Sequence, residues 1–158
     1  MIGFSALQLR QPSAEIMLPD FDDDGNLPSG IHLAKMEEVV ARFGFGSPER
    51  EVETQELLDF VTQELLDFVD WARRAGVQRV MVNGSFTTAN PAPNDVDIVI
   101  LPGQATMADE SSSRLGDVVW RFLQVLIAKD DVDFEAWARD DFGTDREGRP
   151  KGVVELIL

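Results

Sequence analysis

The chain lacks cysteine and tyrosine altogether, and its 158 residues include a single histidine, His32. Without cysteine it can form neither a disulfide bond nor a thiolate metal site, and thiol usage says nothing about its compartment. No apolar run reaches the roughly 20 residues that a membrane-spanning helix requires. Residues 1–10 have no basic start followed by an apolar stretch, so they are a poor match to a signal peptide. We therefore expect a cytoplasmic protein without a membrane segment.

Basic side chains are also scarce. The chain has 14 lysines and arginines against 29 aspartates and glutamates, which gives a formal net charge of −15. Because contacts to phosphates dominate the affinity of proteins for nucleic acids, this charge argues against broad binding to DNA, RNA or anionic membranes. It is compatible with a small substrate, with a basic protein partner, or with a site whose charge a metal ion masks.

The length favours one domain over residues 1–158, with an N-terminal extension and short helix at 1–46 and a core at 47–158. Apolar residues make up 44% of the chain, and helical and strand periodicities are mixed. Both features predict an α/β fold.

The most informative stretch is a pair of predicted strands, at 78–83 and 95–101, joined by a loop rich in proline and asparagine. The second strand opens with Asp95 and Asp97. Side chains alternate along a strand, so both carboxylates leave by one face. The opposite face receives Val96, Ile98 and Ile100.

Two adjacent carboxylates repel each other unless a cation or a shared proton lies between them. Oxygen ligands of this kind suit Mg²⁺, or Mn²⁺ in its place, and Mg²⁺ commonly takes one or two carboxylates together with phosphates of a substrate. Gly84 and Ser85 form a turn just before the acids, where a glycine lets the backbone approach a ligand closely. The stretch therefore predicts a metal site beside a phosphate site, the combination that phosphoryl or nucleotidyl transfer requires.

Gly84-Ser85, nine further residues and then Asp95-Val96-Asp97-Ile98 resemble the signature of the DNA polymerase beta-type nucleotidyltransferase superfamily. The resemblance implies a mixed β-sheet flanked by helices, with one long helix before the first core strand. It also implies Mg²⁺-dependent transfer of a nucleotide from a nucleoside triphosphate to a hydroxyl of a protein, an RNA or a small molecule. Asp95 and Asp97 would be catalytic metal ligands, and Gly84, Ser85 and Thr87 would bind the nucleotide.

The resemblance further implies a third acid on a later strand. Residues 132–137 alternate as a strand would, which makes Asp133 the candidate catalytic base or metal ligand and Glu135 the reserve. The sequence does not decide between the two.

The whole chain also resembles a group of small bacterial nucleotidyltransferase-like proteins, through Leu-Pro-Ser-Gly-Ile-His at 27–32 and Thr-Asp-Arg-Glu-Gly-Arg-Pro-Lys-Gly at 144–152. Two features depart from the superfamily. Asn83 stands where an apolar residue is preferred, and residues 86–90 carry no arginine or lysine to hold a triphosphate. An alternative is therefore a weakly active or inactive protein of this fold that binds a basic partner in a bacterial toxin–antitoxin or defence system.

A long helix is predicted from Ser47-Pro48 to about Ala75. It contains a perfect tandem duplication, because residues 54–61 are repeated without change at 62–69, and the sequence does not show whether the duplication is natural or engineered. Eight residues rotate the second copy by roughly 80° around the helix. We therefore expect Leu66 to be more exposed than its copy Leu58, and we place Leu57 on the buried face with Val61, Leu65, Phe68, Val69, Ala72 and Ala75.

The other predicted elements are helices at 32–43 and 115–128, a loop at 102–113, and a last strand at 152–158. This last strand is apolar enough that we expect it to pair in the sheet or with another chain, as in a homo-oligomer.

An acidic segment at 20–26 matches the first half of a calcium-binding loop, but Ile31 stands where the closing glutamate belongs. We interpret it as an acidic turn with Gly25 at the bend, and His32 as a structural or surface residue.

Overall fold

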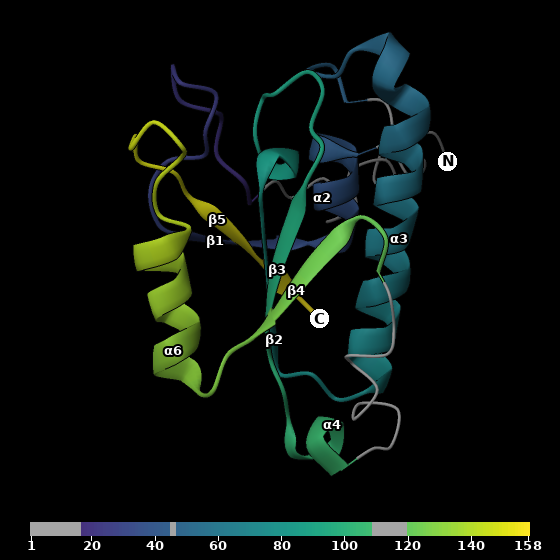
Figure 1. Ribbon diagram of the computed structural model, residues 1–158, viewed down its shortest axis with the longest axis vertical. Coiled ribbons are helices and arrows are strands. Elements are labelled where there is room, and N and C mark those ends of the chain that lie inside the picture. The colour runs from purple at the N-terminus through teal and green to yellow at the C-terminus, as the bar shows by residue number, and fades with distance from the viewer. Residues whose placement is uncertain (1–16, 45–46, 109–119) are drawn as a thin grey trace, which may run out of the picture.

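The computed structural model describes residues 17–44, 47–108 and 120–158, and these form a mixed five-stranded sheet with helices on both faces (Figure 1). The α/β class predicted from the sequence is confirmed. The strands lie in the order β1-β5-β2-β3-β4. Their bounds are Ile31–Lys35 for β1, Arg79–Asn83 for β2, Val96–Leu101 for β3, Leu123–Ile127 for β4 and Val153–Ile157 for β5.

The centre of the sheet is antiparallel and its edges are parallel. β2 pairs antiparallel with both β3 and β5, whereas β1 runs parallel to β5 and β4 runs parallel to β3. The register places Asn83 directly opposite Asp97. The predicted terminal strand is confirmed as β5, and it lies inside the sheet between β1 and β2.

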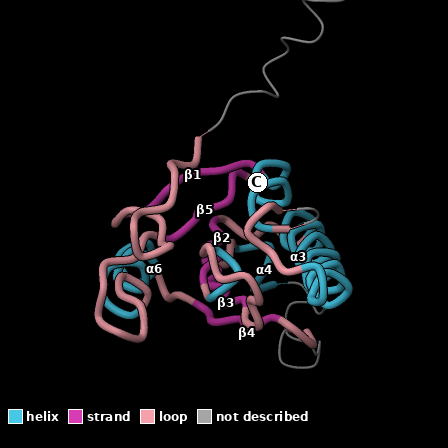
Figure 2. The backbone as a smooth tube through the Cα atoms, turned by 90° about the horizontal axis from the view of Figure 1, so that it is seen from above, coloured by secondary structure: helices cyan, strands magenta, loops and turns pink. Residues whose placement is uncertain are grey.

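One face of the sheet carries the larger hydrophobic core, which α2 (Met36–Phe43) and α3 (Gln55–Arg74) cover (Figures 1 and 2). Val96, Ile98 and Ile100 point into this core, as their alternation predicts. Phe43, Leu65 and Phe68 on the helices are fully buried against the strands. Burying an aromatic or aliphatic side chain of this size contributes about 1.5–3 kcal/mol each.

The opposite face is divided into an apolar half and a polar half. α6 (Asp131–Ala136) covers the apolar half, where Phe134 packs with Met81 and Val99. The polar half lies further along the same strands and carries Asn83 and Asp97. The strands therefore present carboxylates on a face that is only partly covered by a helix.

The long helix before the strand predicted at 78–83 is confirmed as α3 before β2, but it begins at Gln55 and follows a 3₁₀ turn at Val52–Thr54. The duplication behaves as the rotation predicts: Leu58 is 2% exposed, whereas its copy Leu66 is half-buried. The placement of Leu57 on the buried face was wrong, because its side chain is 43% exposed.

Four other predicted elements need correction, the last of them the strand predicted at 132–137. The predicted helix at 32–43 begins as strand β1 and is helical only from Met36, and the predicted loop at 102–113 contains the short helix α4 (Gln104–Ala108). The predicted helix at 115–128 is wrong where it overlaps β4; its first part, 115–119, lies outside the described residues. The apolar spacing in the β4 segment is compatible with a helix or a strand, and the segment forms a strand because it pairs with β3.

The predicted strand at 132–137 is helix α6, which continues into a π-helical turn at Trp137–Asp141. The reason is local: the Asp130 side chain accepts a hydrogen bond from the Asp133 amide at 2.8 Å, which is the N-cap geometry that starts a helix. The alternation of apolar and acidic residues at 132–137 predicts a strand, but the N-cap at Asp130 starts a helix there.

Across the described ranges, none of the helices combines the length and the apolar character that crossing a membrane requires.

Candidate functional site

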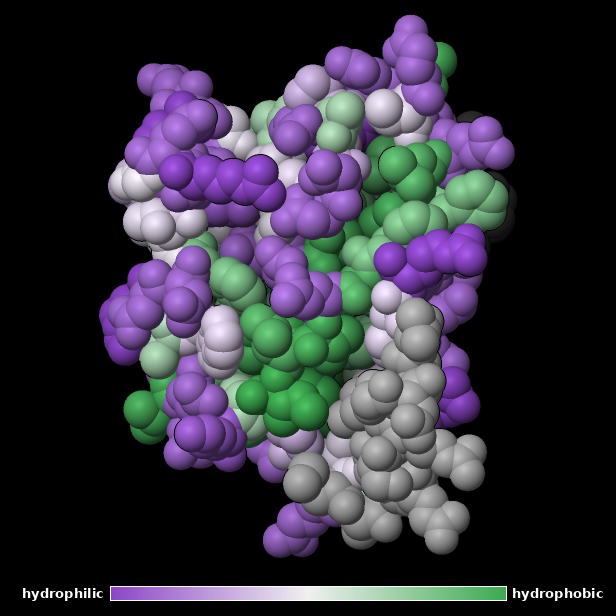
Figure 3. Space-filling model, in the orientation of Figure 1, coloured by the Kyte–Doolittle hydropathy of each residue, from purple (hydrophilic) through white to green (hydrophobic). Residues whose placement is uncertain are grey.

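A pocket of about 800 Å³ lies where β2 ends and β3 begins. Its walls come from the acidic turn at 23–26, the segment 83–97 and the segment 141–151. In Figure 3 hydrophilic side chains dominate this end of the molecule, above an apolar area in the middle of the same view. Three segments that are far apart in the sequence therefore meet around one polar pocket.

The Gly84-Ser85 turn is hydrogen-bonded to Asp95 by main chain and side chain together. The Ser85 amide donates to Asp95 Oδ1 at 3.0 Å, the Ser85 hydroxyl donates to the same oxygen, and the Phe86 amide donates to the Asp95 carbonyl at 3.2 Å. Gly84 has φ of +91°, and a Cβ there would lie 2.7 Å from the Asp95 carbonyl oxygen. Only glycine fits this approach, so the turn and the first acid form one unit.

Asp97 is the second carboxylate of the pocket and lies half-buried on β3, directly opposite Asn83. Burial raises the pKa of its carboxyl above the ordinary value, and the neighbouring charge of Asp95 raises it further. Lys151 and Arg146 act in the opposite direction. Burial and the like charge both disfavour the ionised form of this carboxyl, and a neighbouring positive charge favours it.

Lys151 is a basic residue of the pocket that the sequence analysis missed. It is 8% exposed, and its Nζ donates to the Gly84 carbonyl at 3.0 Å. Burial lowers the pKa of Lys151, while the charges of Asp95 and Asp97 act to raise it. The signal that the sequence offered is its position in the 144–152 segment, which carries the second resemblance.

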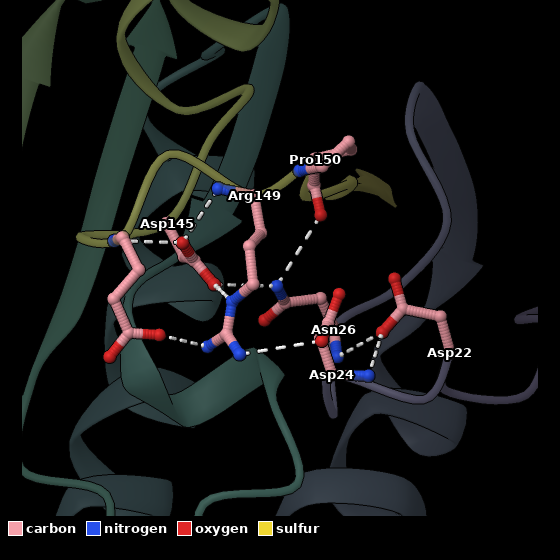
Figure 4. Close-up of polar contacts among 7 residues, drawn as sticks. Asp22, Asp24, Asn26, Asp145, Arg149 and Pro150 are labelled. Carbon is pink, nitrogen blue, oxygen red and sulfur yellow. Dashed lines mark hydrogen bonds and ion pairs between the residues drawn. The ribbon is translucent and has the colours of Figure 1, made fainter.

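The wall that carries Lys151 is fixed by a polar cluster built on Asp145 (Figure 4). Asp145 accepts hydrogen bonds from the Arg149 amide at 2.9 Å, from Arg149 Nε at 2.8 Å and from Asn26 Nδ2 at 3.0 Å. These bonds, the Arg149 amide first, hold the pKa of Asp145 well below its usual range. Asn26 also donates to the Pro150 carbonyl at 3.3 Å, so the acidic turn and the segment before Lys151 are tied together.

The acidic segment at 20–26 is a turn, as interpreted. Asp22 Oδ1 accepts from the amides of Asp24 and Asn26, and Gly25 has φ of +80° at the bend. Asp24 also pairs with Arg149 at 3.3 Å. His32 contacts the Pro28 carbonyl at 2.6 Å, which gives it a structural contact.

The opposite wall is held by Arg50, whose guanidinium is buried. It donates to four carbonyl oxygens, those of Phe43, Phe86, Thr88 and Asn90. Burial lowers the pKa of Arg50 to about 10, so the side chain remains charged at neutral pH. Arg50 therefore fixes the path of the chain between the Gly84-Ser85 turn and the acids.

The structure brings together four of the six predicted site residues: Gly84, Ser85, Asp95 and Asp97. Thr87 is fully buried beneath the turn, where its hydroxyl donates to the Gly84 carbonyl at 3.3 Å, and it does not line the pocket.

Asp133 lies on α6 and outside the pocket, because the segment is a helix and not the strand that was predicted. Its carboxylate accepts from the Lys129 amide at 2.9 Å. The reserve residue Glu135 is also on α6, and it contacts Arg79 at 3.4 Å. Within the described ranges, no cluster of three or more histidine, cysteine, aspartate or glutamate side chains is arranged to hold a metal ion.

Fold and site together define an α/β protein with a mixed sheet and a polar pocket lined by several carboxylates, among them Asp95 and Asp97, and by the buried Lys151. The chain belongs to the family described as "Family of unknown function (DUF6932)", whose model matches residues 19–157. No curated protein and no solved structure matches the chain.

Proposed function

We propose that this protein is a nucleotidyltransferase that uses Mg²⁺ to transfer a nucleotide from a nucleoside triphosphate to an acceptor hydroxyl. The observation that carries the proposal is the joint placement of Asp95, Asp97 and Lys151 around the Gly84-Ser85 turn. Two carboxylates can hold a divalent cation, and a buried ammonium beside them can hold the phosphates that this cation also contacts. The resemblance of Gly84-Ser85 and Asp95-Val96-Asp97 to the DNA polymerase beta-type superfamily supports the same reaction.

The carboxylates of Asp95 and Asp97 would hold Mg²⁺, which supplies charge neutralisation to the phosphates when it is bound. Lys151 binds a phosphate oxygen as a point charge, which is the role for which residues 86–90 offer no basic side chain. The Ser85 hydroxyl, which shares Asp95 Oδ1 with its own amide, orients that carboxylate.

The reaction joins the acceptor oxygen to the α-phosphorus and breaks the bond to the β-phosphate, so that pyrophosphate leaves. The hydroxyl proton would pass to an oxygen of the Asp97 carboxylate that the cation leaves free. Asp133, the base expected from the sequence, does not line the pocket.

The test is to incubate the protein with Mg²⁺ and each α-labelled nucleoside triphosphate in the presence of host-cell protein and RNA. We expect label transfer by the wild type and a loss of at least about 100-fold in Asp97→Asn, the order of effect that removal of an acid–base group produces. Asp67→Asn, on the exposed side of α3, is the matched control, and Asp133→Asn should also retain transfer. Equal rates for wild type and a folded Asp97→Asn variant would refute the proposal.

A second function, binding of a basic protein partner, is favoured by exposed apolar residues near the start of α3. Val52, Leu57 and Phe60 are 85%, 43% and 58% exposed, and Figure 3 shows apolar surface over the N-terminal half of α3. Exposed apolar groups that lie close together are typical of interaction sites. The net charge of −15 favours a basic partner.

Capture of a basic protein by the tagged chain would distinguish the two functions. Under the binding function, the complex survives the Asp95→Asn/Asp97→Asn double substitution and weakens in Phe60→Ser. Under the enzymatic function, label transfer is lost in the double variant and unaffected by Phe60→Ser.

A further inference from the structure

Asn83 is a buried polar side chain without a hydrogen-bond partner for its acceptor. It is the last residue of β2 and 4% exposed, and its Oδ1 accepts no hydrogen bond from the described residues. A buried carbonyl oxygen in this condition costs free energy unless a ligand supplies a donor or a positive charge. The same residue lines the pocket that contains the two acids.

The position of Asn83 places its side chain beside the acids. Asn83 and Asp97 are direct partners in the antiparallel register, and directly opposed residues project from the same face of a sheet. Two pairs further along, on the same face, Met81 and Val99 belong to the apolar cluster beneath α6. Polarity on this face therefore begins at the Asn83–Asp97 pair, where an apolar residue would have continued the hydrophobic contact.

The buried lysine of the pocket does not donate to Asn83. Lys151 Nζ donates to the Gly84 carbonyl. Asp95 Oδ1 accepts from the amide and the hydroxyl of Ser85, and the half-buried Asp97 carboxylate lies opposite Asn83 in the same pocket. An unpartnered carbonyl oxygen and a crowded carboxylate pair thus share one pocket, and a hard divalent cation satisfies both.

We infer that the amide oxygen of Asn83 is the third protein ligand of the divalent cation, together with Asp95 and Asp97, in place of a third carboxylate. The inference rests on the proposed function for the placement of the cation between the two acids. A ligand set of one amide and two carboxylates balances the charge of Mg²⁺ or Mn²⁺, whereas three carboxylates would leave it negative. Lys151 is then left to hold the phosphates, and Asp133 is not required.

The test measures Mn²⁺ binding without nucleotide, by the loss of the free Mn²⁺ signal in electron paramagnetic resonance. Removing a ligand with the nearly isosteric change Asn83→Leu should weaken Mn²⁺ affinity by about 10–100-fold. Asn83→Asp should bind Mn²⁺ more tightly than the wild type because it adds a negative charge. The matched control is Asn90→Leu: Asn90 lines the same pocket, but its Oδ1 already accepts from the Ala92 amide at 2.8 Å, so Mn²⁺ affinity should not change.

Several outcomes overturn the inference: no Mn²⁺ binding by the wild type, equal affinity in a folded Asn83→Leu variant, or weaker binding in Asn83→Asp. If Asn83→Leu does not fold, as judged by circular dichroism, Asn83→Asp decides alone. The result of the Mn²⁺-binding test can be distinguished from the result of the label-transfer test of the proposed function. Binding of Mn²⁺ that depends on Asn83, without any label transfer, would support the metal site and refute the transferase.

Discussion

Replacement of Arg50 tests whether one buried side chain holds the wall of the pocket. Its guanidinium donates to the carbonyls of Thr88 at 2.7 Å and Phe86 at 2.6 Å, to the carbonyl of Asn90, and to that of Phe43 at 3.3 Å. The first three carbonyls belong to the loop between the Gly84-Ser85 turn and the acids. In Arg50→Met, the aliphatic part of the side chain is kept and all of these donors are lost.

The expected cost follows from the number and burial of these bonds. A hydrogen bond to a charged group contributes about 1.5–3 kcal/mol, and the four are not additive because they share one group. Removal of one partner from a buried charged network typically costs about 3–5 kcal/mol, because the groups left behind lose their partner. We expect Arg50→Met to lower the free energy of unfolding by this amount, out of the roughly 5–15 kcal/mol typical of a domain.

Urea-induced unfolding followed by circular dichroism measures this loss, and amide hydrogen exchange at Thr88 and Ala89 reports whether the loop loosens. Arg42→Met is the control: among the described residues Arg42 donates one hydrogen bond, to the Pro19 carbonyl at 2.9 Å, and its guanidinium lies 4.5 Å from the centre of the Phe21 ring, so its loss should cost about 1–2 kcal/mol. Arg50→Lys keeps the charge but loses the planar donor fork, so it should recover only part of the stability. A loss in Arg50→Met no larger than that in Arg42→Met would refute the reasoning.

Two further predictions concern the duplicated helix and the acid pair. Phe60 and Phe68 occupy the same position in the two copies, yet Phe60 is 58% exposed and Phe68 is fully buried. In urea unfolding, Phe68→Ala should lower the free energy of unfolding by about 3–5 kcal/mol and Phe60→Ala by less than about 0.5 kcal/mol. Equal losses would contradict the assigned helix rotation. The raised pKa of Asp97 means that the folded protein binds a proton there more tightly than the unfolded chain does, so stability falls as pH rises from about 4 through the raised pKa. Asp97→Asn should therefore increase the melting temperature above this window in a chelator-containing buffer and have little effect below it, and an unchanged or lower melting temperature at neutral pH would contradict the cause assigned to the shift.

The candidate site was partly predictable because its first half is local in sequence. Gly84, Ser85, Asp95 and Asp97 belong to one strand–turn–strand unit, and the two-residue period of a strand is enough to place both carboxylates on one face. The strand at 78–83, the strand at 95–101 and the long helix before them were predicted for the same reason. Their apolar periodicity is strong and agrees with the packing that the sheet imposes.

The remaining half of the site depends on residues that are distant in sequence. Lys151 reaches Gly84 only because β5 is inserted between β1 and β2, and strand order cannot be read from local periodicity. Asp133 was misplaced because alternation in 132–137 mimics a strand, whereas the N-cap at Asp130 and the packing of Phe134 on the sheet produce a helix. Asn83 was identified by the sequence as a departure from the superfamily, but its missing hydrogen-bond partner is a property of burial.

The sequence by itself determined the α/β class, the central strand pair, the glycine turn and the placement of Asp95 and Asp97, because each depends on local backbone geometry and periodicity. Only the tertiary structure decided which strands are neighbours, which wall Lys151 occupies, and that Leu57 lies outside the buried face of the duplicated helix. These properties arise from non-local burial, where pairing and packing between distant segments outweigh the preferences of any one segment.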